Sequence, residues 1–140
     1  MKLKIKTFTE KTYTLEILYH IGALEDSIHF IFDHESKTCA IVDPAWDPQL
    51  FVDRIQDKGY TLTDIWLTHW HFDHTGTNEY FGNDAVLIAH NSVRPLLSSE
   101  QEVKAVGKVF PALKPSGLPD ITFTEQSSLY FNGEEIVTSQ

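Results

Sequence analysis

The sequence predicts one domain of mixed α/β class. Three observations lead to this prediction: the N-terminal part alternates polar and apolar residues as strands do, an amphipathic helix separates two short apolar strands, and an Asn-Gly turn joins two strands near the end. Strand–helix–strand order favours parallel pairing through a crossover, whereas tight turns favour antiparallel hairpins. A chain of 140 residues, 41% of them hydrophobic, can bury one core and leaves little room for a second.

Helix and turn signals divide the chain into its elements. Asp47 is expected to cap the first helix, with Pro48 at its first position and Gly59 after its end. A short helix is expected at 77–81, and Asn91 can cap a further helix that has a proline in its first turn. The expected strands are residues 2–8, 13–19, 27–33, 38–42, 65–67, 85–89, 121–124, 129–131 and 134–138.

Charge and cysteine content narrow the class of protein. Acidic residues outnumber basic ones by 20 to 11, and the net charge of −9 argues against binding to a phosphate backbone. The lysine-rich N-terminus lacks the apolar segment of a signal peptide, and no apolar run approaches the roughly 20 residues of a membrane span. The single cysteine, Cys39, suits a reducing compartment. We therefore expect a cytoplasmic protein that binds a small-molecule substrate and neither nucleic acid nor membrane.

A polar segment at residues 68–76 follows a predicted buried strand and is rich in histidine. Because alternate residues of an extended chain point to the same side, His69 and His71 can present two imidazoles to one point. Asp73 and His74 follow where the chain must turn, and they can face a neighbouring point. Imidazole and carboxylate ligands suit zinc, iron or manganese, and two adjacent points suggest a two-metal site at the end of a strand.

The same segment, T-H-W-H-F-D-H-T-G, resembles the T-H-x-H-x-D-H-x-G signature of the metallo-β-lactamase superfamily. The flanking segments A-I-V-D-P at 40–44 and L-I-A-H at 87–90 resemble strands of that family. The later L-P-D-I-T-F and N-G-E segments resemble the branch of hydrolases near glyoxalase II. The resemblance implies the N-terminal part of a four-layer αββα sandwich, so residues 1–140 are expected to be a single domain truncated at its C-terminus.

The resemblance also implies roles for individual residues. His69 and His71 would bind a first metal, and Asp73 and His74 a second. Asp73 would also act in catalysis, by orienting the water or hydroxide that bridges the ions and attacks a carbonyl. Asp43 matches an aspartate that supports the histidine loop from behind the ligands, with an ordinary turn residue as the alternative. The implied cofactor is zinc in a two-metal site, and iron or manganese are alternatives.

Further ligands that the resemblance implies have no counterpart in this sequence. The family uses a histidine in an H-T-P-G-H-like segment, a bridging aspartate and a late histidine, but no histidine follows His90. His20 and His90 are candidate substitutes, since both lie near predicted strand ends. His29 is expected in the core, and His34 in a solvent-exposed turn.

Two functions therefore remain open. The first is a metal-dependent hydrolase of a thioester, ester or lactone, and the second is a catalytically incomplete half-domain that folds or functions only with another chain. Half of a sandwich would leave one sheet face bare, and we expect Ile28, Phe30, Leu67 and Ile88 on that face. Covering such a face would favour a homo-oligomer or association with a C-terminal part.

Overall fold

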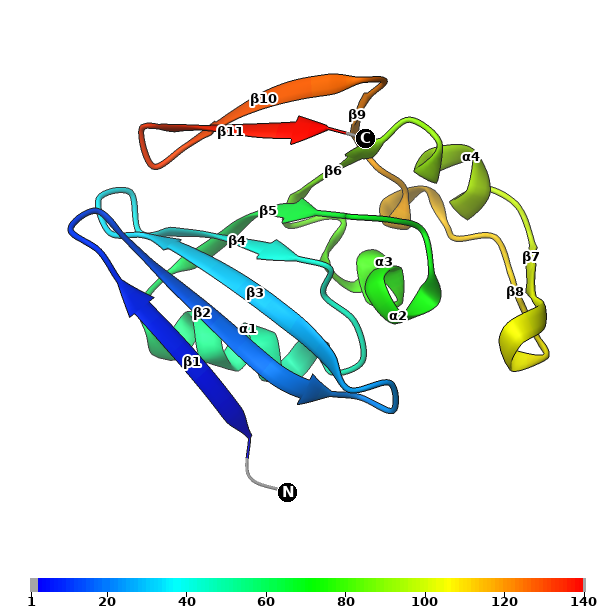
Figure 1. Cartoon of the computed structure of the whole chain (residues 1–140), viewed down its shortest axis with the longest axis horizontal. Helices are drawn as coiled ribbons and strands as arrows, with labels where there is room; N and C mark the ends of the chain where they lie inside the picture. The colour runs from blue at the N-terminus through cyan, green and yellow to red at the C-terminus, as the bar shows by residue number, and fades with distance from the viewer. Residues whose placement is uncertain (1–2, 140) are drawn as a thin grey trace.

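A large mixed sheet organises residues 3–139, the part of the chain that the computed structural model describes (Figure 1). The strands are β1 (Lys4–Thr9), β2 (Tyr13–Ile21), β3 (Asp26–Asp33), β4 (Thr38–Val42), β5 (Thr61–Trp66), β6 (Val86–His90), β7 (Gln101–Val103), β8 (Lys108–Phe110), β9 (Ile121–Phe123), β10 (Gln126–Phe131) and β11 (Glu134–Ser139). The helices are α1 (Pro48–Asp57), α2 (Phe72–Thr75), α3 (Asn78–Phe81) and α4 (Val93–Leu97), with 3-10 turns η1 (Lys104–Val106) and η2 (Pro115–Gly117).

The strand order of this sheet is β1-β2-β3-β4-β5-β6-β9, and it combines two kinds of pairing. β1 to β4 are antiparallel neighbours, whereas β4, β5, β6 and β9 are parallel. The mixed α/β class is therefore confirmed. The parallel strands end at one edge of the sheet, which is where open α/β sheets place their ligands.

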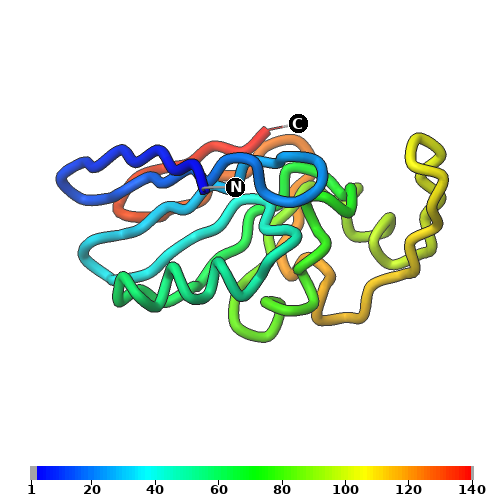
Figure 2. The backbone as a smooth tube through the Cα atoms, turned by 90° about the horizontal axis from the view of Figure 1, so that it is seen from below, coloured from blue at the N-terminus to red at the C-terminus, as the bar shows by residue number. Residues whose placement is uncertain are grey.

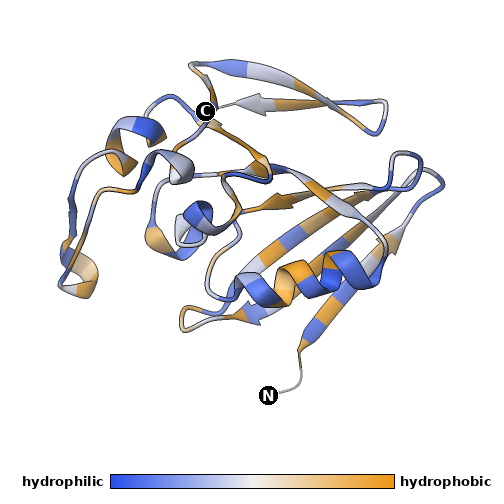
Figure 3. Ribbon diagram, turned by 180° about the vertical axis from the view of Figure 1, so that it is seen from behind, coloured by the Kyte–Doolittle hydropathy of each residue, from blue (hydrophilic) through white to orange (hydrophobic). Residues whose placement is uncertain are grey.

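The first helix forms as its sequence predicts. The Asp47 carboxylate accepts a hydrogen bond from the backbone N–H of Leu50 at 3.1 Å, and Pro48 begins the helix. Gly59 follows the helix with φ of 78°, a conformation that favours glycine. In Figure 3, α1 lies across the face of the sheet that is turned toward the viewer.

We call the face under α1 the closed face, and its residues form the core. Phe30 packs edge-on against Phe51 of α1, with ring centroids 5.8 Å apart. The one cysteine, Cys39, is also fully buried there, opposite Phe32 in the strand register. The closed-face side chains are Leu18, Ile28, Phe30, Phe32, Cys39, Ile41, Ile65 and Leu87.

One charged residue, Glu16, is fully buried on the closed face. Its carboxylate accepts hydrogen bonds from the Arg54 guanidinium, one of them from Nε at 3.0 Å, and Lys58 Nζ lies 3.0 Å from its other oxygen. Arg54 belongs to α1 and Lys58 follows it directly. The buried carboxylate therefore ties the end of α1 to β2.

The opposite side of the sheet, the open face, is only partly covered. The β10–β11 hairpin lies over it, and Phe131 packs edge-on against Trp66 at 5.8 Å. Its turn residues Asn132 and Gly133 have φ of 57° and 70°, as the predicted Asn-Gly hairpin requires. The remaining open-face side chains include Phe8, Leu15, Ile31, Val42, Val86 and Ile121.

The expectation of a bare face lined by Ile28, Phe30, Leu67 and Ile88 is wrong. Ile28 and Phe30 lie on the closed face beneath α1 and are fully buried. Leu67 and Ile88 are each only 6% exposed and line a cavity with Leu129 of the hairpin. Ile88 does lie on the open face, opposite Trp66 and Ile121 in the register, but it is covered, and other side chains such as Val86 and Ile121 are the exposed ones there.

Some smaller features differ from the sequence-based expectations. Ser92, rather than Asn91, is the N-cap of α4, and it makes no side-chain capping bond. β7, η1 and β8, which were not predicted, form an arm that projects from the body of the protein (Figure 2).

No helix within residues 3–139 has the length and apolar composition needed to span a membrane. The expected strand over 2–8 begins at a residue outside the described part of the chain.

Candidate metal centre

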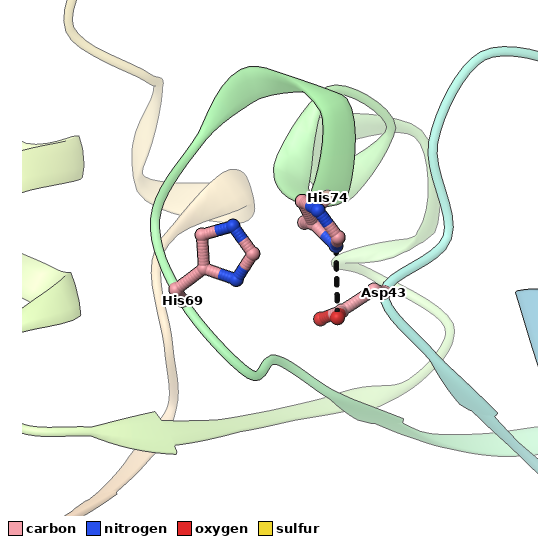
Figure 4. A group of neighbouring side chains, drawn as sticks. All are labelled: Asp43, His69 and His74. Atoms are coloured by element: carbon pink, nitrogen blue, oxygen red, sulfur yellow. Dashed lines mark hydrogen bonds and ion pairs between the residues drawn. The ribbon is translucent and has the colours of Figure 1, made fainter. Parts of the chain in front are cut away.

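The candidate ligands lie at the carboxyl ends of two neighbouring parallel strands. Asp43 follows β4 directly, and the loop that contains His69 follows β5. The backbone N–H of Asp43 donates to the carbonyl of Trp66 at 3.0 Å, which extends the pairing to the strand ends. Figure 4 shows the rings of His69 and His74 and the carboxylate of Asp43 facing the same space.

Asp43 is a buried hydrogen-bond acceptor that holds together residues 67–76, the segment with the predicted ligands, which we call the metal loop. Its carboxylate accepts hydrogen bonds from the Thr68 backbone N–H at 2.7 Å, from the Thr68 hydroxyl, and from His74 Nδ1 at 2.9 Å. Its φ of 50° is uncommon for a residue with a side chain and is sustained by these three bonds. These contacts are of the kind that the supporting role implied by the resemblance requires, and that role stays a prediction.

These hydrogen bonds determine which ring nitrogens are free. A carboxylate only accepts, so His74 Nδ1 donates its proton to Asp43, and His74 Nε2 faces the second carboxylate, with Asp73 Oδ2 at 3.2 Å. The Thr68 hydroxyl gives its proton to Asp43, so it must accept from His69 Nδ1 at 2.9 Å. His69 Nε2 is then free. This arrangement, in which one imidazole nitrogen is bonded by the protein and the other is available, is typical of metal-binding histidines.

Three groups of possible ligands meet here. The first is Asp43, His69 and His74, in which Asp43 already accepts hydrogen bonds from Thr68 and His74. The other two groups share Asp73. One ligand atom from each of His69, His71 and Asp73 lies within 4.8 Å of the others. The same is true of Asp26, Asp73 and His74. The structure thus brings the four predicted ligands together, with Asp73 common to both groups. Imidazole nitrogens and carboxylate oxygens in this mixture fit zinc, iron or manganese.

The two histidines nearest Asp43 have pKa values displaced in opposite directions. Burial lowers the pKa of His69, and the neighbouring His74 ring lowers it further. The hydrogen bond from His74 to Asp43 raises the pKa of His74 despite its partial burial. Because metals bind the unprotonated nitrogen, His69 is available as a ligand to lower pH than His74.

Asp26 is a possible ligand that sequence reasoning missed. It begins β3, far upstream of the histidine motif, and its contact with Asp73 and His74 arises only from the strand order. No local spacing marks it, because an aspartate at the start of a strand is common. The one sequence signal is its position at a strand end, on the strand next to β4.

Other histidines are not part of these groups among the described residues. His20 sits at a φ of 60° with Nδ1 3.5 Å from Glu25, and His90 uses both ring nitrogens in contacts with Ser92 and Thr124. Neither acts as the substitute ligand that was considered. His29 and His34 are both half-buried, so the expected core and exposed positions were wrong: the first lies on the open face, and the second contacts Thr14.

A cavity of about 610 Å³ opens beside His69, between the sheet and the β10–β11 hairpin. Its size is within the usual range for small-molecule sites. Its lining is apolar and aromatic with a few hydroxyl and imidazole groups. The residues that line it include Trp66, Thr68, His69, Trp70, Phe123 and Leu129.

Fold and side chains together define a class of protein: an α/β domain with a cluster of histidines and aspartates, suited to metal ions, at the ends of its parallel strands. Residues 27–135 match the model of the metallo-beta-lactamase superfamily, so the chain belongs to that superfamily. The resemblance drawn from the histidine motif is thereby confirmed.

Individual relatives agree with this family. The chain is 35% identical over 89 residues to hydroxyacylglutathione hydrolase of Erythrobacter litoralis, which covers 61% of this chain and 35% of that protein. It is 38% identical over 63 residues to hydroxyacylglutathione hydrolase of Thermosynechococcus vestitus, which covers 44% of this chain and 25% of that protein. This chain therefore matches well under half the length of these relatives.

Solved structures share the fold at lower sequence identity. The BLEG-1 B3 metallo-beta-lactamase aligns with a TM-score of 0.67 at 19% identity, covering 97% of this chain and 59% of that one. The protein TTHA1623 in a di-iron-bound form aligns with a TM-score of 0.59 at 23% identity, covering 79% and 58%. These structures show the fold, and the chain spans a little over half of each.

Proposed function

We propose that this chain carries the metal centre of a hydrolase that cleaves a thioester, ester or lactone. The observation that supports this most directly is the pair of ligand groups sharing Asp73, beside a cavity of small-molecule size. A thioester is favoured because the sequence relatives are named hydroxyacylglutathione hydrolases. The activity is a proposal, because the chain corresponds to only part of those proteins.

In such a site, each of these residues would have a different role. His69 and His71 would hold one ion, and Asp73 and His74 the other, while Asp43 keeps Nε2 of His74 turned toward Asp73 and the site. Bound ions of this kind lower the pKa of water and polarise a carbonyl. Asp73 lies between the two groups, where it can accept a hydrogen bond and orient a nucleophile. Zinc is proposed as the metal, with iron or manganese as the alternatives.

Metal analysis of the purified protein tests the centre itself. We expect zinc, iron or manganese in the wild type and a loss of most of it in His69→Ala and His74→Ala, because each variant removes an imidazole ligand. His34→Ala is the matched control, since this histidine lies outside both groups. Equal, substoichiometric metal in the wild type and in both ligand variants would contradict the assignment.

Hydrolysis assays separate the two functions left open by the sequence. With zinc or manganese added, we expect slow cleavage of a hydroxyacylglutathione thioester or a lactone. Misplacement of a catalytic group by about 1 Å can cost a hundredfold in rate, and the ligand sets are smaller than the resemblance implies. A turnover near the typical value of about 10 per second would exclude the catalytically incomplete half-domain.

The open face supports a further proposal, that two copies of the chain associate through it. Phe8, Val86 and Ile121 lie on this face and remain substantially exposed, the last two at 40% and 50%. Sedimentation at micromolar concentration is expected to give twice the 16.0 kDa chain mass. Ile121→Lys should weaken the dimer, whereas Val109→Lys, on the projecting arm, should not. A monomer throughout this range would overturn the proposal.

Two other expectations rest on composition alone. A cytoplasmic location is proposed from the single cysteine, and the absence of nucleic-acid binding from the net charge of −9.

A further inference from the structure

We propose that Asp26 is a ligand of the second metal ion, where it supplies a third protein donor beside Asp73 and His74. The inference rests on the proposed function, because it concerns the same centre. It goes beyond the histidine motif, since Asp26 belongs to β3 and not to the metal loop. Catalytic zinc sites usually have three protein ligands and one open position, and the motif alone supplies two at this ion.

The geometry places Asp26 within reach of an ion held by the other two residues. One ligand atom from each of Asp26, Asp73 and His74 lies within 4.8 Å of the others, and all three residues are half-buried. With metal–ligand bonds of about 2.1 Å, tetrahedral ligand atoms lie roughly 3.5 Å apart. The recorded separation of up to 4.8 Å is close to this value, so the three donors lie near the positions that one ion would require.

Trp46 holds the Asp26 carboxylate in this position. Its indole Nε1 donates a hydrogen bond to Asp26 Oδ2 at 2.7 Å. A donor on one carboxylate oxygen fixes the group and leaves its remaining lone pairs for an ion. His74 is held in the same way, because Asp43 accepts a hydrogen bond from its Nδ1, which turns Nε2 toward Asp73 at 3.2 Å from Oδ2. Asp26 and His74 are therefore each oriented by a hydrogen bond to a residue outside the group, Trp46 and Asp43 respectively.

The indole has two further neighbours. Its ring lies directly over Gly22 in the β2–β3 turn, where a Cβ atom would come within 2.2 Å of the ring. Gly22 has a φ of 72°, so this position requires glycine for two reasons. The indole also packs edge-on against Phe72, at 6.1 Å between ring centroids. Phe72 lies between His71 and Asp73, so Trp46 joins the turn to the metal loop.

An ordinary turn aspartate does not account for these features. Trp46 has a φ of 77°, a left-handed conformation that is costly for a bulky residue and persists only where its surroundings impose it. That conformation directs the indole N–H at Asp26, a half-buried carboxylate beside another carboxylate, Asp73. Two such carboxylates repel each other unless a positive charge lies between them, and a metal ion, or a protonated His74 with Nε2 at 3.2 Å from Asp73 Oδ2, supplies that charge.

The two ions would then differ in their ligands. His69, His71 and Asp73 offer two nitrogens and one oxygen, whereas Asp26, Asp73 and His74 offer one nitrogen and two oxygens. Carboxylate-rich sites tolerate manganese better than imidazole-rich sites do. The second ion should therefore be the one that manganese replaces more readily.

The experiment counts zinc equivalents after dialysis and measures the affinity of the weaker site by competition with a chelator. We expect two equivalents in the wild type and one in Asp26→Asn, which keeps the hydrogen bond from Trp46 but weakens the ligand. Glu25→Gln is the matched control, since it removes the neighbouring exposed carboxylate and should retain two equivalents. Trp46→Phe keeps an aromatic ring without the N–H, and should lower the weaker affinity by about 10- to 100-fold.

Each alternative result contradicts the inference. Two equivalents of unchanged affinity in Asp26→Asn would overturn it, as would a wild type that holds a single equivalent. If Asp26→Asn does not fold, an unchanged weaker affinity in Trp46→Phe would overturn it. Failure of the proposed function looks different: the wild type would bind no zinc, or His71→Ala would leave zinc binding intact.

Discussion

The two faces of the seven-stranded sheet are built from the same strands but are packed very differently. On the closed face, aliphatic and aromatic side chains beneath α1 are fully buried, and the one charge among them, Glu16, is paired. On the open face, a two-stranded hairpin covers part of the surface and leaves Val86 and Ile121 substantially exposed. Stability is therefore concentrated on one face, whereas the other remains available for contacts.

The largest effect is expected for Phe30→Ala on the closed face. Phe30 is fully buried against Phe32 and Phe51, so its loss leaves a cavity and should cost about 3–5 kcal/mol in the free energy of unfolding. Urea denaturation followed by circular dichroism measures it. Ile31→Ala, one residue along on the open face, is the control and should cost clearly less. Equal losses would remove the distinction between the faces.

The next effect concerns the buried ion pair. Arg54→Met keeps the length of the side chain but leaves Glu16 with Lys58 alone, and it should cost about 2–3 kcal/mol in the free energy of unfolding. Adding Glu16→Leu to this variant should restore most of that loss, since a buried pair can be replaced by apolar side chains. A double variant less stable than Arg54→Met would contradict this account.

On the open face, Phe131→Ala should loosen the hairpin without unfolding the sheet. It removes the aromatic contact with Trp66, worth about 1 kcal/mol, so amide exchange in β10 and β11 should accelerate while the closed-face strands stay protected. Tyr130→Ala is the control, because Tyr130 points away from the sheet and is 77% exposed. Faster exchange throughout the sheet would show that the hairpin is part of the main cooperative unit.

The smallest effect is expected for Val86→Ser. Val86 is 40% exposed on the open face, so the free energy of unfolding should change by no more than about 0.5 kcal/mol. Leu87→Ser, the adjacent residue facing the closed side, should be severely destabilising because it buries an unpaired hydroxyl and removes apolar contacts. The melting temperatures of Val86→Ser and Leu87→Ser therefore compare the two faces of the sheet at neighbouring positions of β6.

Features specified by neighbouring residues were predictable from the sequence. The capped helix α1 and the turn at Asn132 and Gly133 depend on residues only a few positions apart. The four candidate ligands were also predictable as a group, because they fall within residues 69–74 of one loop. Local spacing was sufficient in each case.

Features specified by distant contacts were not predictable in the same way. Alternation showed that Ile28 and Phe30 share a face, but it could not show that α1 covers this face. Asp26 meets His74 only through the order of the strands, and the short strands of the projecting arm carry little hydrophobic signal. In each case the sequence did not show which distant elements pack against one another.

The fully buried Cys39 allows opening of the closed face to be measured by chemical labelling. Burial raises the pKa of its thiol, so the reactive thiolate is suppressed as long as the face stays shut. It is the only cysteine of the chain. An alkylating reagent can therefore attack only molecules in which the packing around Cys39 has opened, and the rate of labelling at Cys39 measures how often the closed face opens in unmodified protein.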